Sequence, residues 1–424
     1  MPRTETPVLS ISTRRLALLL GGLAMFGPFS IDTIFPAFAV MGAELGADKL
    51  AMQQTISVYL VAYALMSLVH GPLSDAIGRR RVILGGLLVF TLASVGCALS
   101  TDLTTLLLFR ALQGLSAGVG MIVGRAVIRD VLHGDDAQRL MSQVSMIFGI
   151  APAIAPIIGG WILGWSNWPA IFWFLVVFSL VLLAAVWWML PETHLPAARL
   201  PVVPRRLLHD YAAIFLNPRF QRLAAAGAFN FSALFLYISS APAFVLEHLH
   251  IDGRALGEGD FGWFFVPTIG GMVTGAWVSG RAAGRITGER LVAIGFACSA
   301  FAMALNLAYN YWIDVPQVPW AVVPMTLNAF GIALVFPIVT LSVLDMYPRQ
   351  RGAASSLQAF TSLVVAALIA GVVSPAISGS AMALAVGATL LMAVGWSFWR
   401  WELHCSMRGA GPRGERPVLP DRPL

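Results

Sequence analysis

Charged residues are scarce in this chain, and the sequence patterns of several large enzyme classes are missing. Aspartate, glutamate, lysine and arginine make up 11% of the 424 residues, whereas a soluble domain has about 25%. The patterns HExxH and the phosphate-binding GxxxxGKS do not occur, and no polar stretch is long enough for a sizeable soluble domain. The sequence therefore argues against an enzyme or an ATP-driven pump, and it predicts no cofactor and no metal site.

Cysteine and lysine are almost absent as well. Cys97, Cys298 and Cys405 lie far apart without CxxC spacing, which argues against a disulfide framework. Lys49 is the only lysine, so arginine carries nearly all of the positive charge. What remains is apolar, because 58% of the residues are hydrophobic and the mean hydropathy is +0.78. This composition predicts an all-α protein that crosses a membrane many times.

Twelve apolar runs are long enough to cross a bilayer as helices, which takes about 20 residues each. We expect them at residues 16–40, 52–71, 82–99, 104–128, 139–164, 168–190, 220–245, 261–280, 291–311, 320–344, 353–376 and 381–399. With the N-terminus inside, 23 basic residues lie in or beside the inner segments, and two, Lys49 and Arg254, lie in the outer loops. This asymmetry predicts that both termini face the cytoplasm.

The longest polar interruption, residues 191–218, divides the twelve runs into two sets of six. We expect a six-helix bundle over residues 1–190, a cytoplasmic linker over 191–218, and a second bundle with a cytoplasmic tail over 219–424. Within the linker, Arg206–Leu216 has apolar residues at helical spacing, and we expect it to lie flat on the inner membrane surface. Repeated halves are typical of transporters, in which the substrate binds near the midplane between them.

A charged segment, Gly71–Arg81, separates the second and third apolar runs. The pattern G-x-L-(S/A)-D-x-x-G-R-R/K is matched there by Gly71, Leu73, Ser74, Asp75, Gly78, Arg79 and Arg80. By this segment the chain resembles the major facilitator superfamily, which implies twelve transmembrane helices in two six-helix bundles. An ordinary basic turn is the alternative interpretation.

Four further segments resemble one branch of that superfamily, the Bcr/CflA-like drug:proton antiporters. They are Ser30–Pro36 in the first run; Gln54, Ser57 and Tyr59 in the second; Arg110–Gly114 with Gly124–Asp130 in the fourth; and Gly149–Trp161 in the fifth. The second half agrees mainly in layout. Ile34 and Phe35 stand where the branch has tyrosine and leucine, which leaves the substrate open, and Pro169 stands where it has arginine.

Asp32 is the only acid deep in a predicted span. An isolated carboxylate in hydrocarbon is costly, so an intramembrane acid is a functional candidate, here for binding the coupling proton. Asp32 lies ~12 Å and Arg110 ~9 Å from the outer ends of their spans, and thus at a similar depth. The resemblance places their helices side by side at the central cavity, so we expect Arg110 to pair with Asp32 and control its proton. A packing hydrogen bond by Asp32 and an Arg110 that extends to the outer headgroups are the alternatives.

A second charged group is expected at the inner membrane face. The resemblance identifies Asp75, Arg79 and Asp130, with Gly71 and Gly78, as a conformational latch between the halves in the outward-facing state. It implies that Asp75 contacts the N-terminus of the eleventh helix, whose dipole favours a negative charge. A solvated charged loop is the alternative.

The fifth run carries glycines and prolines at intervals of three and four residues. The resemblance identifies an antiporter motif here, formed by Gly149, Pro152, Pro156, Gly159 and Gly160. Glycine allows helices to approach closely, and proline bends a helix by removing a backbone hydrogen bond; a bent packing helix is the alternative. Other candidates could line the substrate cavity or simply pack: Phe35, Gln54, Tyr59, Gln113, Tyr237 and Gln358.

These features together predict a secondary active transporter of the bacterial inner membrane. We expect it to export small, largely apolar organic compounds such as drugs in exchange for protons, with the proton gradient as its energy source. We expect a monomer that has no nucleic-acid partner. A proton-coupled transporter of a natural metabolite, such as a nucleoside, amino acid or sugar, is the first alternative, and a membrane-embedded sensor or enzyme is the second.

Overall fold

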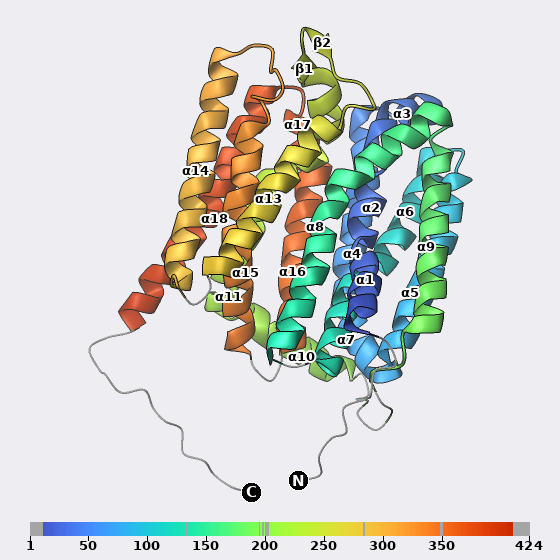
Figure 1. Cartoon of the computed structure of the whole chain (residues 1–424), viewed down its shortest axis with the longest axis vertical. Helices are drawn as coiled ribbons and strands as arrows, with labels where there is room; N and C mark the ends of the chain where they lie inside the picture. The colour runs from blue at the N-terminus through green and yellow to red at the C-terminus, as the bar shows by residue number, and fades with distance from the viewer. Residues whose placement is uncertain are drawn as a thin grey trace, which may run out of the picture.

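The computed structural model describes residues 12–409, apart from residues 133, 195, 197–198, 200–202, 283–284 and 348–350. The start of the first predicted bundle and the end of the predicted tail lie outside these residues. Long helices run side by side and fill most of the molecule (Figure 1). We call the end that holds Thr13 and Gly409 the termini end, and the opposite end, with strands β1 and β2, the hairpin end.

The first half contains six long helical rods, of which the first and fourth are interrupted. Its elements are α1 (Thr13–Ala24), α2 (Phe26–Asp32), the 3₁₀ turn η1 (Phe35–Ala37), α3 (Phe38–Leu45), α4 (Lys49–Ile77), α5 (Arg79–Ala98), α6 (Leu103–Gly118), the π-helical turn η2 (Val119–Val123), α7 (Gly124–Val131), α8 (Gly134–Trp165) and α9 (Pro169–Met189). Pro28 and Pro36 have no N–H to offer the carbonyl groups of Ala24 and Asp32, which accounts for the breaks at those points of the first rod.

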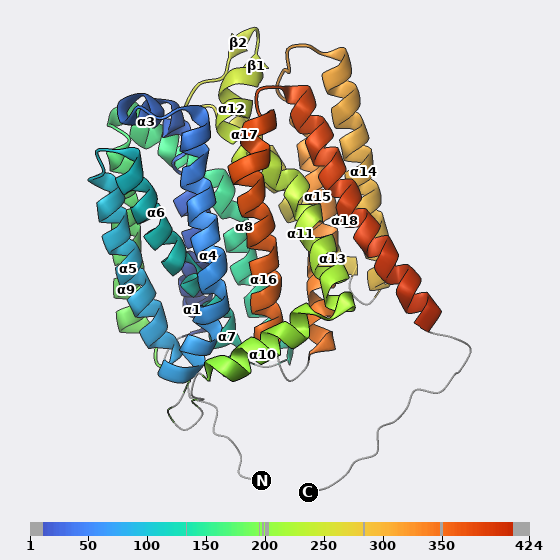
Figure 2. The same ribbon diagram turned by 180° about the vertical axis from the view of Figure 1, so that it is seen from behind.

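The second half repeats the six rods after a short linker helix. Its elements are α10 (Pro204–Phe215), α11 (Pro218–Ser239), α12 (Ala241–Ala243), the π-helical turn η4 (Phe244–His248), β1 (His250–Ile251), β2 (Arg254–Ala255), α13 (Gly262–Ala282), α14 (Gly288–Trp312), α15 (Val323–Met346), α16 (Arg351–Leu368), the π-helical turn η5 (Ile369–Val373), α17 (Ser374–Ile377) and α18 (Ala381–Gly409). Strands β1 and β2 form a two-residue antiparallel ladder, with His250 opposite Ala255. The linker helix α10 lies across the termini end (Figure 2).

Each of the twelve predicted spans corresponds to one of these rods. Eleven helices in the described part of the chain are long and apolar enough to cross a membrane. The remaining rod, α13, has 21 residues, but its five glycines and two tryptophans lower its hydropathy.

Two predicted boundaries were wrong. The segment Gly71–Arg81 is not a loop, because α4 continues to Ile77 and α5 begins at Arg79, with the positive-φ Gly78 as the single residue between them. The last span was expected to end at residue 399, but α18 continues to Gly409. Its extension is tied to the bundle by Glu402, whose two carboxylate oxygens accept hydrogen bonds from Arg219 and Arg222 of α11, both at 2.8 Å.

Two pairs of helices bring the halves into contact. Helix α4 runs antiparallel to α16 and the following turn η5. The two rods touch from Gln54 and Gly371 near the hairpin end to Gly71 and Ser356 near the termini end. Helices α8 and α13 meet near the hairpin end, and their ribbons diverge toward the termini end (Figure 1). The halves are thus joined at the hairpin end on both sides of the molecule.

Candidate functional site

Asp32 lies at the break in the first rod, where α2 ends. The residue is 3% exposed, and within the described part of the chain its carboxylate makes no hydrogen bond and no ion pair. A buried carboxylate without a partner is costly, and carboxyl groups in such places are usually neutral or poised to bind a cation. Asp32 is therefore a buried acid whose charge the protein does not compensate in this conformation.

Arg110 does not pair with Asp32 in this structure, contrary to the expected contact. Its Nη1 donates to the Ser30 carbonyl at 2.9 Å and to the Gln113 side chain at 2.8 Å, and its Nε donates to the Thr55 carbonyl at 3.3 Å. The guanidinium carbon lies 4.6 Å from the centre of the Tyr59 ring, a cation–π contact. Arg110 is fully buried, and in the part of the chain that the structure describes its Nη2 has no hydrogen-bond partner. Arg110 thus binds the backbone two residues before Asp32, and its Nη2 group is left without a hydrogen-bond partner among the described residues.

Two predicted cavity residues belong to the surroundings of Arg110. Gln113 accepts from Arg110 and donates from its Nε2 to the Ser94 hydroxyl at 2.8 Å, whereas Tyr59 supplies the ring that covers the guanidinium. Both side chains are fully buried inside the first half. Ser30 lies in the first motif, but no sequence signal marks it or Ser94 as a partner of this group.

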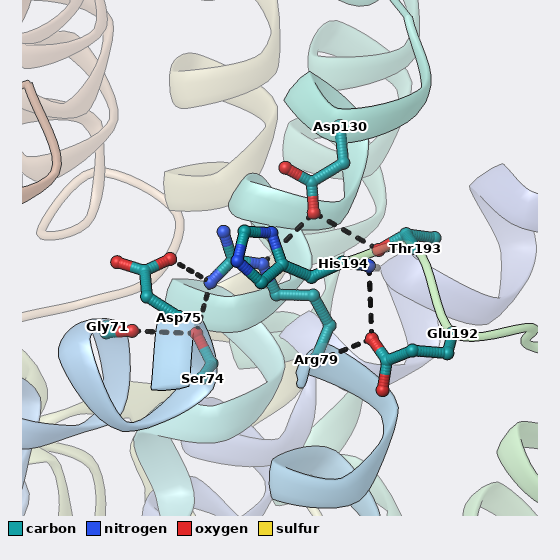
Figure 3. Close-up of polar contacts among 8 residues, drawn as sticks. All are labelled: Gly71, Ser74, Asp75, Arg79, Asp130, Glu192, Thr193 and His194. Carbon is teal, nitrogen blue, oxygen red and sulfur yellow. Dashed lines mark hydrogen bonds and ion pairs between the residues drawn. The ribbon is translucent and has the colours of Figure 1, made fainter. Parts of the chain in front are cut away.

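Arg79 is the centre of the charged group at the termini end (Figure 3). Its guanidinium forms ion pairs with Asp75 and with Asp130, the latter at 3.0 Å, and donates to the Ser74 hydroxyl at 2.6 Å. Ser74 in turn donates to the Gly71 carbonyl at 2.8 Å. The structure thus brings the predicted latch residues together, although Asp75 and Arg79 meet across the break between two helices. No hydrogen bond or ion pair joins Asp75 to the described part of α16.

The sequence does not predict two further members of this group, one hydrogen-bond acceptor and one donor. Glu192, just after α9, accepts from the backbone N–H of Arg79 at 2.8 Å, and Thr193 donates to Asp130 at 3.1 Å (Figure 3). Gly78 has φ of +105°, and a side chain on it would collide with the Glu192 carboxylate. The available signal was an acid directly after the sixth span, at the end of the molecule where the arginines gather.

The predicted antiporter motif on α8 contains two tightly packed glycines, Gly159 and Gly160, and one glycine, Gly149, without close neighbours among the described residues. A Cβ on Gly159 would collide with the carbonyl oxygen of Thr33, the residue after Asp32, and a Cβ on Gly160 would lie 2.5 Å from the carbonyl oxygen of Glu258 in the other half. Gly149 has open space around it. Pro152 and Pro156 lie inside α8, each leaving one carbonyl without its helical donor. The motif therefore places α8 against both the Asp32 break and the second half.

Side chains of the first half also contact the second half near the hairpin end. Phe35 is fully buried, and its ring stacks on that of Phe265 with 6.4 Å between centroids. The Gln54 amide donates to the carbonyl of Gly371 in the π-helical turn η5 at 3.1 Å, and Lys49 pairs with Glu247 at 2.6 Å. Phe35 and Gln54, predicted as cavity residues, thus lie at the contact between the halves.

The two cavity candidates of the second half take part in contacts within that half. The Tyr237 hydroxyl accepts from Asn306 at 2.8 Å, and its ring packs edge-on against Phe244. Gln358 of α16 donates to the Thr340 hydroxyl of α15 at 3.2 Å. Both residues are buried.

Comparison with known proteins gives one family and several relatives. A family model described as Major Facilitator Superfamily matches residues 18–371. Multidrug resistance protein D of Escherichia coli is 31% identical over 349 residues, which cover 81% of this chain and 84% of that protein. The bicyclomycin resistance protein homolog of Haemophilus influenzae is 25% identical over 370 residues, 86% of this chain and 89% of that protein. A solved D-xylose–proton symporter has a TM-score of 0.70 over 91% of this chain and 97% of that one at 13% identity, which shows a shared fold.

Proposed function

The chain belongs to the major facilitator superfamily, and from that premise we propose that it is a proton-coupled antiporter that exports small, largely apolar organic compounds such as drugs. Relatives named for multidrug and bicyclomycin resistance support this substrate class, in keeping with the resemblance to the Bcr/CflA-like branch. We place the protein in the bacterial inner membrane as a monomer, with both termini in the cytoplasm because of its arginine distribution. On this proposal the termini end is cytoplasmic and the hairpin end faces outward.

One observation carries the proton coupling: Asp32 is a buried carboxylate without a hydrogen-bond or ion-pair partner among the residues that the structure describes. In hydrocarbon the neutral form of such a group is favoured, so Asp32 binds a proton until a cation or a polar group approaches. Arg110 lies at the same level with its Nη2 free. We propose that Arg110 turns this N–H toward Asp32 when the proton leaves, so that the carboxylate exchanges a proton for a charge partner.

The remaining site residues fit a cycle in which the halves open alternately at the two ends. We propose that residues 1–190 and 219–424 move as two bundles joined by the linker 191–218. The Arg79 group then stabilises the arrangement of α4, α5 and α7 at the cytoplasmic end, while the α8 glycines and Phe35 form the outer contact. Thr33 and Phe35 lie one and three residues after Asp32. A movement of the backbone at Asp32 on proton binding or release therefore also moves the residues of the outer contact.

The test uses everted membrane vesicles whose lumen has been acidified by respiration. Adding a transported compound from an antibiotic panel that includes bicyclomycin should release protons from the lumen, read with a pH-sensitive dye. Asp32→Asn keeps the shape of the side chain but removes its titratable proton, so substrate-triggered proton release should vanish. Wild-type uphill transport by this variant would exclude Asp32 as the coupling site.

A matched control is available on the fourth rod. Asp102 is the exposed N-cap of α6 and accepts from the Thr105 N–H at 2.9 Å. Asparagine is an equally good N-cap, so Asp102→Asn makes the same chemical change without a proton-coupling role and should transport normally. A metabolite transporter would release protons only with its natural substrate, and a sensor or an enzyme would release none.

A further inference from the structure

The linker helix α10 connects the halves and also packs under them. It contacts α11 and α16 of the second half, and it lies across the termini end below α4 and α16 (Figure 2). Tyr211 and Ile214 face the bundle and are buried, whereas Leu208 and Phe215 are exposed. One face of α10 is therefore docked on the transporter.

Tyr211 fills a defined gap in the hydrogen bonding of α4. Pro72 lies inside that helix and has no N–H, so the carbonyl of Leu68, four residues earlier, lacks its helical donor. The Tyr211 hydroxyl donates to this carbonyl at 2.9 Å. Burial raises the pKa of Tyr211 to about 12, so the phenol keeps its proton, and with it the donor, at physiological pH.

The bond lies where the halves meet and one turn from the Arg79 group. A Cβ on Gly71 would lie 3.5 Å from the Ser356 hydroxyl of α16, so α4 and α16 touch at this level. Asp75, the partner of Arg79, follows Pro72 by three residues on the same helix. Because α10 packs on the second half, the Tyr211 bond ties that half to the end of α4.

We propose that Tyr211 is a strap residue that holds α4 and α16 together at the termini end and must release the Leu68 carbonyl for that end to open. It is a positioning residue, since it acts through α4 and touches neither proton nor substrate. The proposal rests on alternating access in the proposed function. Its first two tests, however, read conformation directly and need no substrate and no proton gradient.

The reporter is Ala354→Cys, a small change at a fully buried residue of α16, after replacement of Cys97, Cys298 and Cys405. Tyr211→Phe keeps the ring but leaves the Leu68 carbonyl unpaired while the termini end is closed. The equilibrium between the closed and open forms of that end should therefore shift toward opening by about fivefold to a hundredfold. We expect the rate of maleimide labelling of the reporter to rise by that factor. Tyr309→Phe is the matched control, because Tyr309 donates to the Gln317 carbonyl at the hairpin end, and it should leave the rate unchanged.

A second substitution identifies the bond responsible. Pro72→Ala restores an N–H that can pair with the Leu68 carbonyl within α4, which makes the Tyr211 hydroxyl dispensable. Adding Tyr211→Phe to Pro72→Ala should therefore change labelling less than twofold. An equal effect of Tyr211→Phe in both backgrounds, or none in either, would overturn the strap.

A third measurement covers the case in which Tyr211→Phe does not fold. Tyr211→Cys and Leu68→Cys can be joined in the folded protein with a short bis-methanethiosulfonate, which forms a reducible disulfide with each cysteine and fixes α10 to α4. The strap must open during the cycle, so cross-linking should stop transport and reduction should restore it. Continued turnover of the cross-linked protein would overturn the proposal, whereas normal strap behaviour without proton coupling would count only against the proposed function.

Discussion

Gly160→Ala tests whether the antiporter motif controls contact between the halves. The new methyl carbon would lie 2.5 Å from the Glu258 carbonyl oxygen, so α8 and the second half must separate by several tenths of an ångström. Overpacking of this kind costs about 1–3 kcal/mol. Because Glu258 belongs to the other half, the cost applies only while the halves are closed at the hairpin end. The equilibrium should shift about 5–150-fold toward opening at that end.

The assay is maleimide labelling of Ser239→Cys, at a fully buried position near the hairpin end whose carbonyl accepts from Gln53 across the halves at 3.1 Å. Labelling should become faster in Gly160→Ala, and efflux should slow. Gly149→Ala, on the same helix with open space around it, should change neither. Gly159→Ala strains a contact within the first half and should lower the thermal stability of the protein instead. Equal effects of Gly149→Ala and Gly160→Ala would refute the reasoning.

Three further predictions follow from the charged residues. Arg110→Ala should stop efflux, and Arg110→Lys should restore little of it in a vesicle assay, because one ammonium cannot replace a planar group that donates to four acceptor atoms. Arg79→Ala and Asp75→Asn should reduce turnover sharply yet change substrate affinity less than about twofold in a direct binding measurement. The lost ion pairs change the conformational equilibrium of the two halves by about 1–3 kcal/mol and leave the substrate cavity unchanged. Exchanging the charges of Lys49 and Glu247 together should keep efflux within about fivefold of wild type, because an exposed pair contributes about 0.2–1 kcal/mol; a larger loss would show that the pair acts as more than a rim contact.

Much of the fold follows from the sequence, because span length and arginine placement are single-chain properties. Each predicted span corresponds to a helical rod, because a backbone in lipid has no water to bond and a helix pairs its N–H and C=O groups internally. The segment Gly71–Ile77 was misread because glycine, proline and aspartate usually end helices. Here Ser74 donates to the Gly71 carbonyl and Arg79 pairs with Asp75, so side-chain contacts three and four residues apart keep this segment helical.

For the candidate site, the sequence predicts the charged residues but not their hydrogen-bond partners. Asp32, Arg110 and the Arg79 group could be found because a charge in or beside a span is rare and must be accommodated. The partners could not be found, since they depend on which side chain reaches which carbonyl. Arg110 binds the Ser30 and Thr55 carbonyls, and Tyr211 binds that of Leu68. Backbone acceptors are present at every residue and carry no sequence signal.

The glycines of α13 have a consequence for how the protein is made. They reduce the hydropathy of this helix, yet they also allow it to pack closely on α15, where a Cβ on Gly275 would lie 2.5 Å from the Phe330 carbonyl oxygen. Alone, such a helix partitions weakly into lipid during synthesis. It should therefore stay beside the translocon until α15 has been translated, so that the two enter the bilayer together. Glycosylation mapping of chains truncated before and after α15 would show the change, and efficient insertion of α13 in the shorter chain would contradict it.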